Sequence, residues 1–317
     1  MRVFVAGATG VIGRQLVPRL AAAGHEVHGM THSESKQAML RKLGAVPVVA
    51  DALDPDQVAA AVAGARPDVI VHQLTAIGAI NPRHFERDFA LTNRLRTEGT
   101  DHLLSAGQAM GARRFVAQSN GAFTYARTGG AVKGEDDPLD STPPREWRAM
   151  VAAIRHLEDA VLGADWTEGI VLRYGAFYGP GTSLAPGEEQ FELVRMRKFP
   201  LVGDCGGVWS FIHIADAAEA TAAAIEHGSR GVYNVVDDDP APVAEWLPAL
   251  AQLLGAKKPI RVPRFVGRLF VGEVGAVMMT ELRGASNAKA KLELAWRPAH
   301  RSWRQGFVAD DRSRTPV

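Results

Sequence analysis

Short apolar runs alternate with amphipathic stretches over most of the chain, and this alternation predicts strands separated by helices. Several runs are almost continuously apolar, which is typical of parallel strands covered on both faces. Residues 54–65 and 97–111 place apolar side chains at helical spacing. The pattern predicts an α/β fold with a doubly wound parallel sheet. Its strands are expected at residues 2–6, 26–30, 46–50, 68–72, 114–118, 169–173 and 232–236.

The first apolar run leads directly into a glycine loop. Gly7, Gly10 and Gly13 are spaced three residues apart, and an amphipathic stretch follows them as far as Gly24. A strand, a glycine loop and a helix in this order let the backbone approach a pyrophosphate and aim helix N–H groups at it. A glycine-rich turn without a ligand is the alternative. The expected dinucleotide contacts are Gly7, Thr9, Gly10, Val11, Ile12 and Gly13.

The second half of the chain has a different pattern. Glycine and proline interrupt the alternation at residues 179–181, 185–187 and 203–207, and such loops commonly carry specificity. Residues 240–306 are mostly helical in pattern, with an apolar face expected from Trp246, Leu250, Leu253 and Leu254. We therefore predict a dinucleotide-binding domain at residues 1–173, completed by the strand near 231–236. Residues 174–317 are predicted to form mainly a smaller, interleaved substrate-binding lobe.

Composition narrows the classes of partner. The 317 residues carry 36 basic and 35 acidic side chains, a formal net charge of +1, which gives no reason to expect nucleic acid or an anionic membrane. No stretch approaches the roughly 18 apolar residues that span a bilayer. The single cysteine, Cys205, excludes an internal disulfide and a multi-cysteine metal site. We expect a cytoplasmic protein without a metal centre, a monomer or homodimer acting on a small molecule.

Several further motifs occur in a recognisable order. They comprise residues 7–13, 68–72, 99–100, 114–116, 172–180, 211–216, 232–235 and 296–298. In this order the chain resembles the extended branch of the short-chain dehydrogenase/reductase superfamily, the NAD-dependent epimerase/dehydratase-like family. The resemblance runs nearly from end to end, and it implies a Rossmann sheet of about seven strands and a nicotinamide dinucleotide as cofactor.

The chain departs from this family at its catalytic residues. The family uses a Tyr-x-x-x-Lys pair on one helix and a Ser or Thr after the fifth strand, and none of the four tyrosines here has such a lysine. Counting back from Glu158 puts Met150 at the tyrosine position and Ile154 at the lysine position. Ser119 stands one residue before the usual hydroxyl position and Asn120 occupies it. These two remain the catalytic candidates, and the chain resembles an atypical member of the family that lacks the proton relay.

The residues after the second predicted strand favour NADPH over NADH. An NAD-preferring enzyme places Asp or Glu there, whereas this chain has Thr31, His32 and Ser33, with Lys36 shortly after. Glu34 argues the other way, and equal acceptance of NAD is the alternative. The resemblance and the topology of open α/β sheets add further cofactor contacts. They are Asp51, Leu74, Thr75, Tyr174 and Gly175.

Large aromatic and thioether side chains near the carboxyl ends of the strands favour a bulky, flat, apolar substrate over a sugar nucleotide, which needs arginines. The insertion at residues 77–90 is either a lid or a solvated helix. Each substrate candidate is alternatively a core residue. The candidates are Trp147, Met150, Phe177, Tyr178, Trp209 and Met278.

These observations favour an NADPH-dependent ketoreductase acting on a polyketide- or quinone-like aromatic, for example of the angucyclinone type. A phenol beside the substrate ketone then supplies the proton that the protein lacks. A non-catalytic dinucleotide-binding regulator similar to the NmrA-like proteins is the alternative, because such proteins also lack the relay. A sugar-nucleotide epimerase or dehydratase is third, since it needs the missing base.

Overall fold

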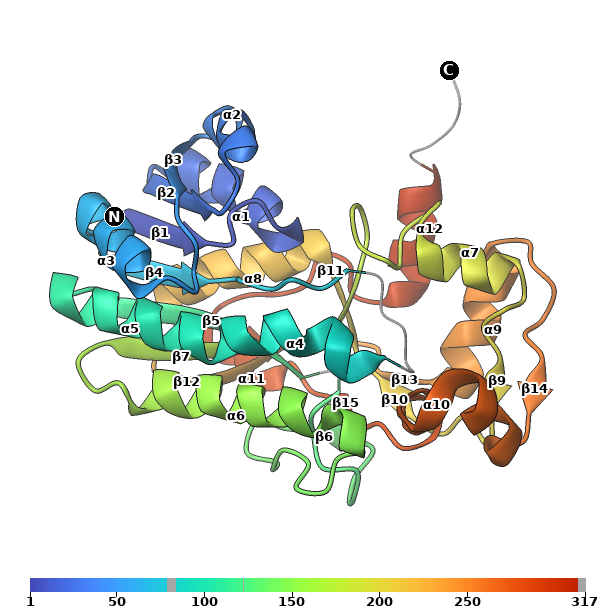
Figure 1. The fold of residues 1–317 in the computed structure, drawn as a ribbon. Coiled ribbons are helices and arrows are strands. Elements are labelled where there is room, and N and C mark those ends of the chain that lie inside the picture. The colour runs from blue at the N-terminus through green and yellow to red at the C-terminus, as the bar shows by residue number, and fades with distance from the viewer. Residues whose placement is uncertain (79–83, 122, 313–317) are drawn as a thin grey trace.

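Seven parallel strands form the central sheet of the chain, which a computed structural model describes at residues 1–78, 84–121 and 123–312 (Figure 1). They are β1 (Arg2–Ala6), β2 (Glu26–Thr31), β3 (Ala45–Val49), β4 (Val69–His72), β5 (Arg114–Asn120), β7 (Glu168–Tyr174) and β12 (Gly231–Val235). Their spatial order is β12-β7-β5-β4-β1-β2-β3. Each predicted strand is present and the predicted doubly wound fold is confirmed. The order reverses between β1 and β4, and ligands of such sheets bind beyond the strand ends at this point.

Alternating side chains of the strands fill two hydrophobic layers. Val3 and Val5 of β1 face one cluster, whereas Phe4 and Ala6 face the other. The first layer is covered by α1 (Val11–Ala22) and α8 (Ile214–His227), and the second by α3 (Pro55–Ala65), α5 (Glu98–Met110) and α6 (Arg148–Gly163). The sheet is thus buried on both faces, which explains its continuous apolar runs. The remaining elements of this part are α2 (Gln37–Lys42), α4 (Phe85–Arg96) and short 3₁₀ turns at Glu34–Lys36 and Arg145–Trp147.

The boundaries of the predicted helices follow local signals. Asp54 caps α3 by accepting hydrogen bonds from the backbone N–H groups of Asp56 and Gln57. Helix α5 ends at Gly111, which adopts a left-handed φ of 66°. Both helices lie where the apolar spacing predicts them.

A second lobe packs beside the carboxyl ends of the strands, where Figure 1 shows α7, α9, α10 and α12 gathered together. Its short strands pair as β8 with β11, β9 with β14, β10 with β13 and β6 with β15. Its strands are β6 (Val132–Lys133), β8 (Ala176–Tyr178), β9 (Leu201–Val202), β10 (Val208–Trp209), β11 (Phe211–His213), β13 (Ala241–Pro242), β14 (Arg261–Val262) and β15 (Gly284–Ala285). Its helices are α7 (Glu189–Arg195), α9 (Val243–Leu253), α10 (Arg264–Thr280), α11 (Ala288–Glu293) and α12 (Trp303–Arg312).

The core of this lobe draws on residues from both sides of the predicted domain boundary. Phe85, Trp147 and Met150 join Phe211 and Trp246 in one buried cluster. The two predicted domains therefore share this buried cluster, which gives their predicted interleaving a structural basis. The division at residue 173 stays a prediction.

The predicted apolar face in residues 240–306 is correct at Trp246 and Leu250, which are buried on α9. It is wrong at Leu253, which is 41% exposed because the helix ends there, beyond the packed core. Among the described helices, none has both the length and the apolar character needed to cross a bilayer.

Candidate functional site

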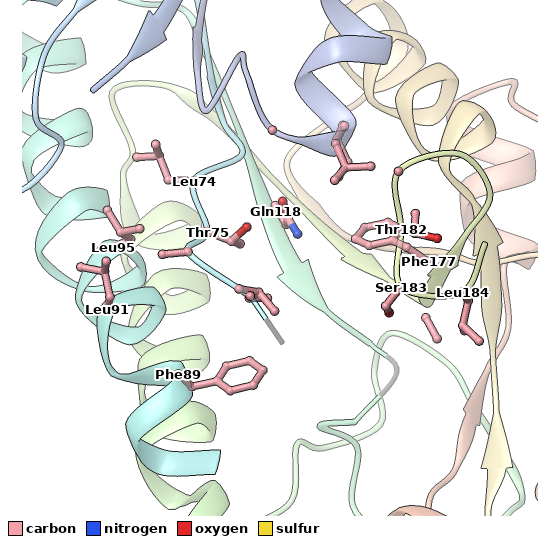
Figure 2. A pocket seen from close by; sticks show the side chains of 18 of the residues that line it. Leu74, Thr75, Phe89, Leu91, Leu95, Gln118, Phe177, Thr182, Ser183 and Leu184 are labelled. Atoms are coloured by element: carbon pink, nitrogen blue, oxygen red, sulfur yellow. The ribbon is translucent and has the colours of Figure 1, made fainter. Parts of the chain in front are cut away.

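A cavity of about 860 Å³ extends from the carboxyl ends of the first four strands into the second lobe. Figure 2 shows its two walls: Leu74, Thr75 and the α4 residues Phe89, Leu91 and Leu95 lie opposite the segment from Phe177 to Leu184, with Gln118 of β5 between them. The cavity thus lies at the topological switch point of the sheet, where a dinucleotide and its substrate are expected.

The glycine loop forms one end of the cavity with a geometry that excludes side chains. Gly7 has a φ of 90°, and a Cβ built there would lie 2.6 Å from the carbonyl oxygen of Gln73. A Cβ on Gly13 would lie 2.5 Å from the carbonyl oxygen of Ala8. No side chain caps α1 at Gly10, so the first N–H groups of this helix remain available to an anion. All the predicted loop contacts line the cavity: Gly7, Thr9, Gly10, Val11, Ile12 and Gly13.

Most of the residues predicted to hold the adenosine end also line the cavity. His32 and Lys36 do so after β2, as do Thr31 and, after β3, Asp51. Ser33 does not, and its hydroxyl hydrogen-bonds to the Ser35 hydroxyl at 2.8 Å. His32 and Lys36 therefore bring an imidazole and an ammonium group to the expected adenosine end, whereas Ser33 is not part of this lining.

The end of β4 supplies further cofactor contacts. Leu74 and Thr75 line the cavity as predicted. Gln73 lines it too and is only 5% exposed, and its Oε1 atom has no hydrogen-bond partner among the described residues. A buried acceptor without a donor is costly, so this atom fits a donor on a bound ligand.

Tyr174 and Gly175 do not line the cavity, although the resemblance implies a cofactor contact there. The Tyr174 hydroxyl lies 2.7 Å from the Thr221 hydroxyl and accepts a hydrogen bond from Gln73. Burial raises the pKa of Tyr174 to about 12, so this phenol is a poor proton donor. A Cβ on Gly175 would lie 2.8 Å from the carbonyl oxygen of Ser210, and the adjoining cavity wall is formed instead by Ala176 and Phe177.

Neither catalytic candidate reaches the cavity. Ser119 is 2% exposed and donates its hydroxyl proton to Glu158 at 2.6 Å. Glu158 also accepts two hydrogen bonds from the Arg173 guanidinium, at 2.9 and 2.6 Å. Burial lowers the pKa of Arg173, but the hydrogen bonds and charge of Glu158 outweigh this effect and raise it. The Asn120 side chain accepts from the backbone N–H of Phe123, and the β5 residue that lines the cavity is Gln118.

The substrate candidates divide into two groups. Trp147, Phe177, Trp209 and Met278 line the cavity, which agrees with a flat apolar ligand. Met150 and Tyr178 do not line it: Met150 is 1% exposed in the apolar cluster with Ile154, and Tyr178 packs edge-on against Phe307. The positions that the family gives to its acid and lysine are therefore buried apolar core.

Several cavity residues were missed by the sequence analysis. Phe85 and Phe89, one turn apart on α4, stack with ring centroids 4.2 Å apart. Both rings belong to the insertion at residues 77–90, which the sequence predicts as a lid or a solvated helix. Residues 79–83 of this insertion lie outside the described residues. Thr182 and Ser183 lie between residues 179–181 and 185–187, the glycine- and proline-containing loops expected to carry specificity, but neither residue is among the predicted contacts. Other missed residues of the lining include Gln73, Gln118, Phe123, Gln190, Lys198, Phe199 and Phe270.

The charged groups of the cavity are confined to two regions. His32, Lys36 and Asp51 follow β2 and β3, whereas Glu189 and Lys198 belong to α7 and the turn after it. Within the described part of the lining there is no arginine, tyrosine or cysteine. All four tyrosines are at most 2% exposed and lie outside the lining. The polar side chains in the wall between the two regions are uncharged: Gln73, Thr75, Gln118, Thr182 and Ser183.

Comparison with known proteins agrees with this geometry. The profile of the NAD dependent epimerase/dehydratase family matches residues 3–236. A Streptomyces sp protein named 3-diazoavenalumate denitrifying reductase is 46% identical over 97% of this chain and 99% of its own length. The 4-hydroxy-2-methyl-3-oxo-4-farnesyl-3,4-dihydroquinoline-1-oxide ketoreductase of Stigmatella aurantiaca is 26% identical, covering 81% of this chain and 74% of its own. The structure of UDP-glucose 4-epimerase from Thermus thermophilus in complex with NAD superposes with a TM-score of 0.73, 26% identity and 100% coverage of both chains.

Proposed function

The chain belongs to the NAD dependent epimerase/dehydratase family, and from this premise we propose that it is an NADPH-dependent reductase that replaces an aromatic diazo group by hydrogen. That it is an oxidoreductase follows from this family and from relatives that are named reductases and that match this chain over most of their length. The predicted alternative of a non-catalytic regulator is therefore set aside. The relative at 46% identity supports the diazo group as the reacting group.

The observation that carries this proposal is that the described residues of the central wall include no acid. The described wall between the two charged regions offers amide and hydroxyl groups, and Met150 and Ile154 are buried in apolar core. Reduction of an isolated ketone needs a proton as the alkoxide develops, and a positioned acid typically contributes about 10²–10⁴ in rate. An acceptor that needs no proton suits this wall better.

Replacement of a diazonium group meets this condition. When bound, the reduced dinucleotide supplies the hydride and is itself oxidised. At the aromatic carbon a C–H bond forms and the C–N bond breaks, and N₂ leaves with the electron pair of that bond. From the diazonium cation no proton is consumed; from the neutral diazo oxide of a hydroxyaryl compound the same hydride transfer leaves a phenolate, which takes its proton from water. The reaction therefore balances without the family's tyrosine and lysine.

The cavity wall also suits the reactivity of such a substrate. Aryl diazonium ions couple with phenols and thiolates, and in the described lining there are neither tyrosines nor cysteines. Cys205 is fully buried, and its thiol donates to the carbonyl oxygen of Val202. Trp147 and Trp209 present aromatic rings in the lining, and such rings stabilise cations. Imidazoles and amines can also couple, but His32, Lys36 and Lys198 lie in the two charged regions. In the described part of the wall between them, an electrophilic cation therefore meets aromatic rings and no phenol, thiol, imidazole or amine.

The cofactor is expected to be NADPH. The loop from Gly7 to Gly13 would hold the pyrophosphate, and Asp51 would contact the adenosine. His32 and Lys36 would contact a 2′-phosphate, because the chain offers them where an NAD-preferring enzyme has a carboxylate.

A ketone flanked by a phenol is the second candidate acceptor, as the sequence suggested. The relative named as a quinoline ketoreductase favours it, and the substrate's own phenol would then supply the proton. A sugar nucleotide is disfavoured, because no arginine lines the described part of the cavity to bind its diphosphate.

The test is a turnover assay on the purified chain with NADPH and three acceptors: a hydroxyaryl diazo compound, a hydroxyquinone and a simple aryl ketone. We expect NADPH oxidation with the diazo compound, one N₂ per NADPH, and deuterium from 4-deuterated NADPH at the ring carbon. Reduction of the simple ketone at an equal rate would overturn the proposal. Turnover of the hydroxyquinone alone would replace the diazo acceptor by the second candidate.

A further inference from the structure

Two lysines line the described cavity, and they belong to different regions. Lys36 follows β2 beside the glycine loop, where the cofactor is expected. Lys198 follows α7 in the second lobe, among the residues that face the substrate. We propose that Lys198 binds a carboxylate of the substrate, in the part of the cavity that the second lobe forms. This inference rests on the proposed function, because it concerns the ligand of the same cavity.

The backbone around Lys198 is held firmly. Its N–H donates to the carbonyl oxygen of Leu193 at 2.7 Å, which closes the turn after α7. Arg197 adopts a left-handed φ of 59°, and its Nε atom donates to the carbonyl oxygen of Lys258 at 2.8 Å. Phe199 continues the cavity lining and packs edge-on against Trp246. The turn thus fixes where the lysine side chain starts.

The ammonium group of Lys198 has no hydrogen-bond or ion-pair partner within the described residues. Neighbouring cations differ: Arg195 pairs with Glu192 at 3.2 Å, and Arg197 is bound to a carbonyl. An ammonium group offers three donors on a flexible stem, so Lys198 is available to a ligand.

Glu189 is the other charged group at this end, and it also lines the cavity. No ion pair joins it to Lys198 in the described structure, and it repels an anion. This makes Glu189 an informative comparison: removal of its charge should strengthen carboxylate binding, whereas removal of the Lys198 charge should weaken it.

The chemistry of the whole wall indicates one kind of ligand. An aromatic and aliphatic surface with a single amine in its described second-lobe part matches a flat, conjugated acid that carries its reacting group and its carboxylate at different ends. The name of the relative at 46% identity, a reductase of 3-diazoavenalumate, also describes a carboxylate substrate. Because Lys198 is exposed to solvent, the charge pair is expected to contribute about two- to fivefold in affinity rather than more.

The experiment compares Lys198→Gln and Glu189→Gln with Lys257→Gln, a nearby exposed lysine outside the cavity lining. For a diazo arene carboxylate, we expect KM to rise about two- to fivefold in K198Q, to fall in E189Q and to stay unchanged in K257Q, with kcat little affected. With the methyl ester of the same compound, all of these enzymes should have similar KM values. Added salt should raise KM of the acid in the parent enzyme but not in K198Q.

A binding measurement separates this inference from the proposed function. The nitrogen-free product acid and its methyl ester are titrated in the presence of NADP⁺, with quenching of Trp147 and Trp209 fluorescence as the readout. Lys198-dependent binding of the acid without turnover of any diazo compound would refute the proposed function and keep the carboxylate site. Turnover with equal KM values for acid and ester, unchanged in K198Q, would refute the carboxylate site and keep the proposed function.

Discussion

The hydroxyl group of Ser119 donates to the carboxylate of Glu158 across 2.6 Å, inside the ion pair that Glu158 forms with Arg173. A serine at the end of β5 is thereby part of the link between β5, α6 and β7 rather than a free catalytic hydroxyl. The same network continues through the Tyr125 hydroxyl, which lies 3.0 Å from Arg173 and donates to Asn234 of β12.

Ser119→Ala is therefore expected to change stability and not chemistry. Loss of a hydrogen bond to a buried carboxylate should lower the free energy of unfolding by about 1.5–3 kcal/mol. The turnover number of the folded enzyme should stay within about twofold of the parent, in contrast with the loss of about 10²–10⁴ expected for a general acid. Denaturant unfolding and saturation kinetics on the same preparation check both statements. A large fall in kcat at unchanged stability would instead show that Ser119 takes part in catalysis.

Much of the fold could be predicted from the sequence because its signals are local. The apolar runs and the spacing of Gly7, Gly10 and Gly13 depend on residues close together in the chain, and the strands and the loop contacts follow from them. The family prediction is confirmed for the same reason, since its motifs have fixed positions along the chain.

The substrate end could not be predicted in the same way, because distant segments build it. Phe89 of α4, Gln118 of β5 and Lys198 after α7 meet only in the folded chain. The resemblance predicts Ser119 and Asn120 as catalytic candidates from the family's hydroxyl position, but the β5 residue that lines the cavity is Gln118. The aromatic ring of Tyr178 predicts a substrate contact, but packing against Phe307 buries it instead.

Stability is expected to fall in mild acid because of His72 at the end of β4. Burial lowers the pKa of His72 to about 4, and its Nδ1 atom accepts from the Leu74 N–H at 3.2 Å. The folded state therefore keeps this histidine neutral, and its contribution to stability is complete above the unfolded pKa of about 6.5. Between about pH 6.5 and 4 the free energy of unfolding should fall by about 1.4 kcal/mol per pH unit from this group.

His72→Asn isolates that contribution, because the asparagine oxygen can accept from Leu74 but does not titrate. We expect lower stability near neutral pH and a shallower loss between about pH 6.5 and 4 than in the parent. Urea unfolding at a series of pH values measures both curves. Parallel curves for the two proteins would exclude His72 as the titrating group.

Lys36 should determine the preference for the phosphorylated cofactor. Lys36→Gln removes an ammonium group from the cavity beside Thr31 and His32, so NADPH binding should weaken about tenfold while NADH binding changes little. Ser33→Ala serves as the comparison, because its hydroxyl is turned to Ser35, and it should leave both affinities unchanged. Fluorescence titration of the parent and of each variant with NADPH and with NADH measures these affinities. Equal weakening of NADPH and NADH would indicate that Lys36 contacts a group common to both.

A phenol placed in the cavity wall should react with the proposed substrate. Phe177 lines the cavity beside the end of β7, where the parent wall has no tyrosine among the described residues. In Phe177→Tyr, an aryl diazonium ion should couple to the new ring through an azo bond, with loss of one ring proton and no change in redox state. We expect time-dependent inactivation, an azo absorbance band and the full mass of the diazonium group on the peptide containing residue 177. The parent enzyme, whose four tyrosines are buried, should gain no such adduct during turnover. An unmodified and fully active variant would indicate that no free diazonium ion forms against this wall.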